Sequence, residues 1–397
     1  MLIEIILFLI LGILAGTFTG LIPGVHINLI GVSLVALSTS LLSSLSSIYF
    51  VTFITSMAIA HTFVDFIPSI FLGCPDTDTE LSILPGHELL KKGLGYEAIL
   101  LTAYGSLAAV FILVLIALPS TLILEEIYAV IQNIIPFLLI AVILFLIYLE
   151  RNKLQSIFVI SLTGALGLIV LNLNSLSEPL LPLLTGLFGT SMLLISIKNK
   201  EKIPPQEISK PILDKSFISP LFGATLAAPF SSLLPGLGSG QAAIIGNSIS
   251  RAGKRGFLFL LGATNTLVMG FSFIALYAVS RTRTGAAVAI KEILGEPPWQ
   301  VLVLIMALIL ISGIISFFIT THLARFFSKR ISEINYSKIS IATILFISLL
   351  VFSFSGILGL IVLAVSTATG IFCISLNVKR TNMMGCLLLP TIIIYLF

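Results

Sequence analysis

Long uninterrupted apolar stretches constrain the fold of this chain more than any other feature. Stretches that could cross the roughly 30 Å hydrocarbon core of a bilayer as helices lie at 97–118, 133–149, 154–174, 177–197, 301–321, 339–355, 356–376 and 384–397. They are continuous rather than alternating, and an open sheet in lipid would leave backbone groups without partners. The sequence therefore predicts an all-α polytopic membrane protein.

The composition excludes several other protein classes. Of the 397 residues, 57% are hydrophobic and only 10% are charged, whereas soluble domains carry about 25% charged residues. A soluble enzyme, a nucleic-acid binder and a disordered chain are therefore excluded. Cys74, Cys373 and Cys386 lack metal-ligand spacing, so neither a zinc site nor a disulfide framework is expected. The first 22 residues contain Glu4 and no Lys or Arg, which argues against a cleaved signal peptide.

The basic residues predict the orientation in the cell membrane. Residues 1–90 contain no Lys or Arg, and eighteen of the 21 basic residues fall into six groups. Cytoplasmic loops are enriched in Lys and Arg, so we expect all six groups in the cytoplasm and both termini outside. The groups are Lys91/Lys92, Arg151/Lys153, Lys198–Lys215, Arg251/Lys254/Arg255, Arg325–Lys338 and Lys379/Arg380.

Two segments fit this orientation only as re-entrant hairpins. Between the basic groups that flank residues 217–250 there is a single break, at Pro235-Gly236. This pattern predicts a hairpin that enters from the cytoplasm and returns there. Residues 3–44 contain the same kind of break at Pro23-Gly24 and predict a hairpin that enters from outside.

The two halves of the chain correspond element by element. We predict a first repeat over 1–197, a cytoplasmic linker over 198–215 and a second repeat over 216–397, each repeat with about five transmembrane helices. Gly20-Leu-Ile-Pro-Gly24 also matches Ser232-Leu-Leu-Pro-Gly236. Five predicted crossings separate the starts of the halves, so the repeats have inverted topology. Inverted repeats with discontinuous helices are typical of secondary transporters, whose site lies near the midplane.

The hairpin tips are candidate anion sites. A helix that starts after Pro-Gly presents unpaired amide hydrogens and partial positive charge, and glycines allow close backbone approach to a ligand. The simpler interpretation is an interfacial turn with glycines that serve helix packing. The candidate substrate-binding residues are Pro23, Gly24, His26, Asn28, Pro235, Gly236, Gly238, Ser239, Gly240, Gln241, Asn265, Arg281 and Arg283.

The acidic patch at 76–80 has three interpretations. Carboxylates and threonine hydroxyls are hard oxygen ligands for Na⁺, and intramembrane carboxylates also carry protons. Alternatively, Asp76 or Asp78 forms an ion pair with Arg281 or Arg283, or the patch reaches water. Asp76, Thr77, Asp78 and Thr79 are the candidate residues for coupling to Na⁺ or H⁺, and we expect no other cofactor or metal.

Further polar residues occupy comparable places on two interrupted helices. Thr264-Asn265-Thr266 on one and His61-Thr62 with Asp65 on the other would either line a cavity or form hydrogen bonds between helices. His26 would shuttle a proton, bind an anion or simply pack. Glu125 and Glu126 lie on the connector 119–132 and predict the solvated edge of an interfacial helix on the outside.

At these motifs the chain resembles the large permease subunit of tripartite tricarboxylate transporters, the TctA type, and its shorter archaeal relatives. The resemblance implies carboxylate import with a small membrane subunit and an extracytoplasmic binding protein. The chain departs from it at Cys74–Thr79, where a neutral glycine-proline run is expected. The matching segments are 16–24, 75–93, 232–238, 264–266 and 380–390.

The sequence is compatible with three functions. The first is a secondary active transporter for a small organic anion, which the resemblance indicates to be a carboxylate. The second is a translocase for a polyprenyl-phosphate lipid, because the 235–240 tip also resembles motifs of such translocases. The third is a non-transporting membrane scaffold. The chain contains no Gly-x4-Gly-Lys-Ser/Thr phosphate loop, so a gradient or a partner must drive transport. We expect no nucleic-acid partner. Besides the assembly with a small membrane subunit and a binding protein, the chain could form a homodimer.

Overall fold

The regular elements of the described chain are all helical. The computed structural model describes residues 2–22, 45–72, 79–131, 135–176, 179–199, 203–233, 238–282, 284–332 and 336–396. Over these residues the longer helices are α1 (Leu2–Leu21), α3 (Ser47–Val64), α6 (Gly95–Ile131), α7 (Ile135–Tyr148), α8 (Lys153–Leu171), α11 (Ile218–Leu233), α12 (Ser239–Ser250), α13 (Lys254–Val279), α14 (Gly285–Leu294), α15 (Trp299–Arg330), α16 (Tyr336–Ser375) and α17 (Gly385–Leu396).

Short helices connect or extend these elements. They are α4 (Phe66–Leu72), η1 (Glu80–Ser82), α5 (Ile83–Leu90), α9 (Leu180–Leu184), the π-helical turn η2 (Thr185–Thr190), α10 (Ser191–Asn199), η3 (Lys215–Phe217) and η4 (Arg380–Met384). Within the described ranges, nine segments are long and apolar enough to cross a membrane, which confirms the predicted polytopic all-α class.

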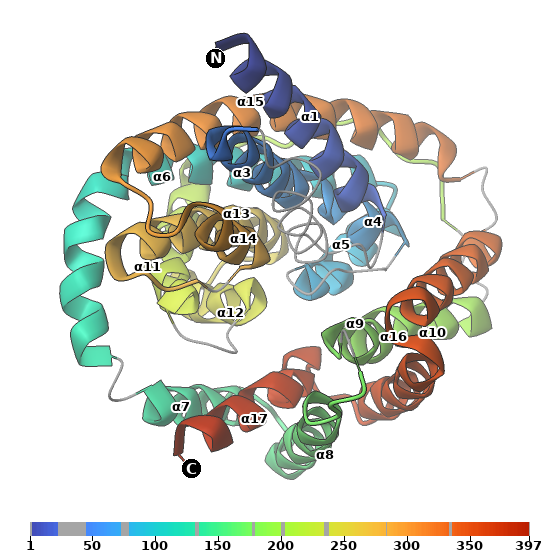
Figure 1. Cartoon of the computed structure of the whole chain (residues 1–397). Helices are drawn as coiled ribbons and strands as arrows, with labels where there is room; N and C mark the ends of the chain where they lie inside the picture. The colour runs from blue at the N-terminus through green and yellow to red at the C-terminus, as the bar shows by residue number, and fades with distance from the viewer. Residues whose placement is uncertain are drawn as a thin grey trace.

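The helices form an inner group and an outer group. In Figure 1, α6 and α15 on one side and α7, α8, α16 and α17 on the other surround α3, α11, α12 and α13. The apolar windows of α3–α4 and α13 are each 94% buried, whereas that of α16 is 22% buried. The outer helices expose large apolar side chains such as Leu115 and Ile357. An apolar surface of this kind is stable against lipid and not against water.

Glycines allow neighbouring helices to pack on the inner helices α3 and α13 with their backbones in contact. Gly12, Gly16 and Gly20 form a stripe on α1, and a Cβ added at Gly16 would lie 2.2 Å from the carbonyl oxygen of Met57 on α3. Between α6 and α13, a Cβ at Gly105 would lie 2.0 Å from the carbonyl oxygen of Phe259. Close backbone approach of this kind maximises van der Waals contact, which is what holds helices together in lipid.

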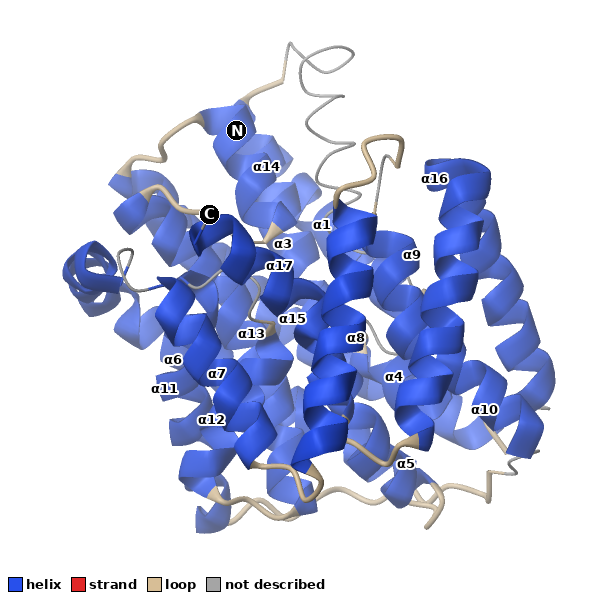
Figure 2. Cartoon of the chain, turned by 90° about the horizontal axis from the view of Figure 1, so that it is seen from below, coloured by secondary structure: helices blue, strands red, loops and turns tan. Residues whose placement is uncertain are grey.

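Contacts bring the six basic groups to one end of the bundle, which we call the basic end. Lys254 forms an ion pair with Glu88 of α5, and the backbone N–H of Lys379 donates to Glu150 beside Arg151 (2.9 Å). Gln206 of the linker donates to the carbonyl of Leu90 (3.0 Å). The group Arg325–Lys338 begins in the last turns of α15. Helix α15 runs antiparallel to α6, so these turns lie near the start of α6. In Figure 2, α5 and α10 lie at this end, and both chain termini lie away from it.

Helices α11 and α12 form an antiparallel hairpin with both outer ends at the basic end. The Ser219 hydroxyl donates to the carbonyl of Ser250 (3.3 Å) near the outer ends, and the Ser231 hydroxyl donates to the carbonyl of Gly238 (3.0 Å) near the tip. The helices have 16 and 12 residues, or about 24 and 18 Å, less than the roughly 30 Å of hydrocarbon. Re-entry of this hairpin into a bilayer stays a prediction, and residues 23–44 of the first hairpin lie outside the described residues.

Several helix pairings recur between the two halves. The α1–α3 pair is parallel and runs toward the basic end, whereas the α11–α13 pair is parallel and runs away from it. Likewise α6 packs on α13, and α15 packs on α3. In the outer group α8 packs on α17, and α16 packs on η2 and α10. These opposite directions are those an inverted repeat requires, although the repeat itself and its boundaries stay predictions.

Of two helix boundaries predicted from the sequence, the structure contradicts one and confirms the other. The expected end of a span at 118 is wrong, because α6 continues through Pro119 to Ile131, whereas the interfacial position of 119–132 stays a prediction. A proline inside a helix removes one backbone hydrogen bond and can kink the helix without ending it. The expected break between 339–355 and 356–376 is confirmed by Gly356, whose φ of 60° interrupts α16. That left-handed conformation favours glycine.

Candidate functional site

A buried polar cluster joins the two halves where α3 ends against the middle of α13. The side-chain amide of Asn265 donates to Oδ2 of Asp65 (2.8 Å), and the hydroxyls of Thr62 and Thr266 are 3.1 Å apart. Asp65 is 3% exposed and Asn265 is 4% exposed. These distances confirm one of the two interpretations of these residues, namely hydrogen bonds between helices. A buried carboxylate in a membrane protein marks a candidate functional site.

The end of α1 packs directly on this cluster. The Thr19 hydroxyl lies 3.0 Å from Nδ1 of His61, one turn of helix before Asp65. A Cβ added at Gly20 would lie 3.1 Å from the backbone nitrogen of Asp65. Gly20 begins the Gly-Leu-Ile-Pro-Gly motif, so the first predicted hairpin tip leaves α1 beside this carboxylate.

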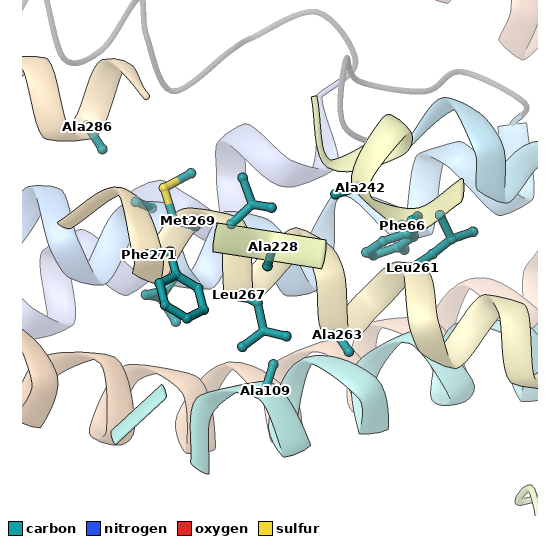
Figure 3. Close-up of a cluster of buried hydrophobic side chains, with 14 of the residues drawn as sticks. Phe66, Ala109, Ala228, Ala242, Leu261, Ala263, Leu267, Met269, Phe271 and Ala286 are labelled. Carbon is teal, nitrogen blue, oxygen red and sulfur yellow. The ribbon is translucent and has the colours of Figure 1, made fainter. Parts of the chain in front are cut away.

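The second motif reaches the corresponding place on α13. Ser232, at the position that matches Gly20, donates from its hydroxyl to the carbonyl of Val268 (3.2 Å), within one turn of Asn265. Figure 3 draws Ala242, in the first turn of α12, in the same buried cluster as Phe66 of α4 and Leu261 of α13. Both Pro-Gly motifs therefore follow helices that pack on the paired polar residues.

The start of α12 carries a buried donor. Gln241 is 1% exposed, and its Oε1 accepts the backbone N–H of Gly238 (2.6 Å), which caps the helix. Its Nε2 has no hydrogen-bond partner among the described residues. Ser239 and Gly240 are buried in the same turn. This donor, together with the positive end of the helix dipole, makes the turn chemically suited to an anion.

Thr79 connects the predicted coupling segment to the cluster. Its hydroxyl lies 2.6 Å from that of Ser69, and the Ser69 hydroxyl donates to the carbonyl of Asp65 (2.7 Å). Thr79 is fully buried. The segment that contains the acidic patch therefore ends next to α4, close to the polar cluster.

Arg281 lies far from Asn265. It follows the last turn of α13, is exposed, and places its guanidinium over the ring of Tyr128 at 5.2 Å. Sixteen residues separate it from Asn265, or about 24 Å along a helix. Asn265 and Thr79 both lie at the Asp65 cluster, and Gln241 lies in the first turn of α12, which packs on α13. Arg281 lies beyond the end of α13, away from Asn265.

Other candidates fall outside the described residues. These are Pro23, Gly24, His26, Asn28, Asp76, Thr77, Asp78, Pro235, Gly236 and Arg283.

Sequence patterns alone missed Thr19 and Ser69. Both are small hydroxyl residues in apolar helices, where such residues usually bond their own backbone. Their positions one turn from a motif glycine and from Asp65 were the available signals.

Comparison with known proteins gives the family. A family model described as the tripartite tricarboxylate transporter TctA family matches residues 6–385. The chain belongs to the TctA family. It is also 33% identical over 401 residues to an uncharacterized protein of Methanocaldococcus jannaschii, covering 98% of this chain and 99% of the relative. No solved structure matches the chain.

Membership in the TctA family confirms the predicted resemblance. It makes the chain a membrane component of a tricarboxylate transporter system, and a TctA protein is not an enzyme. Tripartite transporters work with further subunits. The paired Pro-Gly motifs of this TctA chain are therefore its candidate transport site.

Proposed function

We propose that this chain is a secondary active transporter for a small organic anion, most simply a carboxylate. The anion binds near the midplane, between the predicted tips at Gly24–Asn28 and Gly236–Gln241. The observation that carries the proposal is the buried Nε2 of Gln241, a donor without a partner among the described residues at the start of α12. A carboxylate oxygen would accept from it and from the amides of that helix start.

The recurring helix pairs support alternating access between two inverted repeats. Helices α3 and α13 cross at Thr62–Thr266 and Asp65–Asn265, and each is flanked by its own motif helix. Rocking of one repeat against the other would expose the shared centre to one side at a time. By the positive-inside rule the basic end faces the cytoplasm and both termini face outside.

The coupling ion is Na⁺ or H⁺, held by Asp76, Thr77, Asp78 and Thr79. The support is the Thr79–Ser69–Asp65 chain of hydrogen bonds, which brings the end of this segment to the polar cluster. Arg281 and Arg283 would act at the far end of α13, where positive charge attracts an anion toward the centre. A small membrane subunit and an extracytoplasmic binding protein complete the system.

Uptake into proteoliposomes tests the transport proposal. Purified chain would be reconstituted and supplied with radiolabelled citrate under an imposed Na⁺ or pH gradient. Citrate accumulation above that of empty vesicles supports transport of a soluble anion. The proposal would be overturned if citrate and simpler carboxylates accumulated no more than in empty vesicles, whichever gradient is imposed. That result would favour the lipid-phosphate translocase or the scaffold.

Gln241→Glu tests the tip specifically. A glutamate keeps the acceptor that caps Gly238 but replaces the donor with an oxygen, so the helix start is retained and the anion is repelled. We expect the KM for the anion to rise about tenfold or more. Gln300→Glu, at an exposed position on α15, is the matched control. An unchanged KM in Gln241→Glu would remove this residue from the site.

Asp78→Asn tests the coupling segment. If Asp78 holds the coupling ion, the substitution changes the dependence of uptake on Na⁺ or pH. A loss of thermal stability with unchanged ion dependence would instead assign Asp78 to a structural ion pair.

A further inference from the structure

A cavity of about 880 Å³ opens at the basic end, apart from the hairpin tip. It lies between α5, the end of α7, the α12–α13 turn and the segment from α16 to η4. Ile244, Asn247, Ser248 and Arg251 line it from one face of α12. Arg251 is ten residues after Gln241, or about 15 Å along the helix. The basic part of the cavity is therefore separate from the candidate transport site at the other end of α12, whereas its apolar part reaches Ile244, one turn after Gln241.

Four basic side chains line this cavity, and they differ in their partners and in their exposure. Lys254 is paired with Glu88, and the ammonium of Lys379 donates to the carbonyl of Leu149 (3.0 Å). Arg251 is exposed at the end of α12. Nη1 of Arg380 is buried and has no hydrogen-bond partner among the described residues.

The positive charge of Arg380 persists at neutral pH. Arg380 lies in the connection between α16 and α17, and burial lowers the pKa of its guanidinium to about 10. A buried charge without a paired acceptor is costly, and guanidinium groups bind carboxylates and phosphates through two parallel hydrogen bonds. An oxyanion at this place would accept a hydrogen bond from the unpartnered Nη1 and neutralise the guanidinium.

Part of the remaining wall is apolar. Leu146 and Leu149 of the α7 end, Ile244 of α12 and Phe257 of α13 line the cavity beside the basic residues. Ligand sites typically combine such walls with a few polar groups, in volumes of about 300–1,000 Å³. A small inorganic anion would leave the apolar part of this volume unfilled.

We propose that this cavity binds an oxyanion group carried on an apolar body. Arg380, with Arg251, holds the oxyanion, and the apolar body lies against Leu146, Ile244 and Phe257. Both a soluble fatty carboxylate and the phosphate of an anionic lipid have this chemistry. The proposal does not depend on transport, because binding is measured directly.

Two binding measurements on the full chain test the proposal and distinguish the sources. The soluble arm titrates octanoate into protein in phosphatidylcholine nanodiscs and follows binding by calorimetry. The lipid arm adds phosphatidylglycerol to the nanodiscs and measures its retention by native mass spectrometry. Binding of octanoate assigns a soluble ligand, and selective retention of phosphatidylglycerol assigns a lipid.

Matched variants locate the binding. Arg380→Gln should weaken whichever ligand binds by about tenfold or more, and Arg380→Lys should retain part of the affinity. Lys210→Gln makes the same charge change at an exposed linker position outside the cavity lining and should leave binding within about twofold of wild type.

A second variant tests the cavity without changing Arg380, so the test does not depend on whether Arg380→Gln folds. Ile244→Trp fills the apolar part of the cavity and leaves all four cations in place, so it should also abolish binding. The proposal is overturned if neither probe binds the wild type, or if Arg380→Gln and Ile244→Trp both bind as tightly as the wild type.

Discussion

Oδ2 of Asp65 accepts a hydrogen bond of 2.8 Å from the side-chain amide of Asn265, a residue 200 positions later in the chain. The two side chains come from α3 and α13, the two most deeply buried helices, and each lies within one turn of contacts made by a Pro-Gly motif helix. This polar contact therefore joins the two halves at the place where both motif helices pack.

Removing the amide should destabilise the protein. In Asn265→Ala the buried Asp65 carboxylate loses the hydrogen bond from this amide, and hydrogen bonds to charged groups contribute about 1.5–3 kcal/mol. Thermal unfolding in detergent, followed by size-exclusion fluorescence, measures the change.

The exchanged pair is the control for that substitution. Asn265→Asp alone places two carboxylates together and should lower the unfolding temperature further. Asp65→Asn combined with Asn265→Asp restores one amide and one carboxylate and should recover part of the loss. If all variants unfold at the temperature of the wild type, this hydrogen bond does not hold the halves together.

The Thr62–Thr266 contact should make a smaller contribution. Valine keeps the shape of threonine and removes the hydroxyl, so Thr62→Val, Thr266→Val and the double variant form a mutant cycle. We expect a coupling energy of about 0.6 kcal/mol, which is typical for hydrogen bonds between membrane helices. Strictly additive unfolding free energies would contradict the contact.

Gly16→Ala should prevent α1 from packing closely on α3. Its new Cβ would lie 2.2 Å from the Met57 carbonyl oxygen, so the helices must separate, at a cost of about 1–3 kcal/mol. Gly189→Ala is the control, because a Cβ there meets nothing within 4 Å. Equal yields and equal unfolding temperatures for the two variants would argue against the packing at Gly16.

Single cysteines should report the two ends of the bundle. Introduced at Arg151, Lys210 and Arg251, all exposed, they should react with a membrane-impermeant maleimide only after the cells are opened. A cysteine at Glu125, exposed near the end of α6, should react in intact cells. Cys373 and Cys386 are buried and should give little background, and Cys74 is replaced by serine in the parent chain. Labelling of Arg151→Cys and Glu125→Cys from the same side would undo the predicted orientation.

The sequence predicted those parts of the fold that depend on neighbouring residues. Apolar length gave the spans, Gly356 marked a helix break, and the basic groups shared one end of the bundle. It did not predict that α6 passes through Pro119, because the cost of one lost hydrogen bond is offset by packing elsewhere along the helix.

The candidate site was predictable only in part. The motif match at Gly20 and Ser232 pointed to two equivalent places, and the polar residues on both interrupted helices were visible. Their pairing was not, since residues such as Asp65 and Asn265 have no local pattern that selects a partner.

By itself, the sequence determined that this chain is a helical membrane protein with paired Pro-Gly breaks and a basic end, because hydrophobic length and charge act locally. Only the tertiary structure decided that Asp65 meets Asn265, that Gln241 caps the start of α12, and that Arg281 lies far from them. Those positions depend on the direction and crossing of helices that are distant in the chain, which local residue preferences do not set.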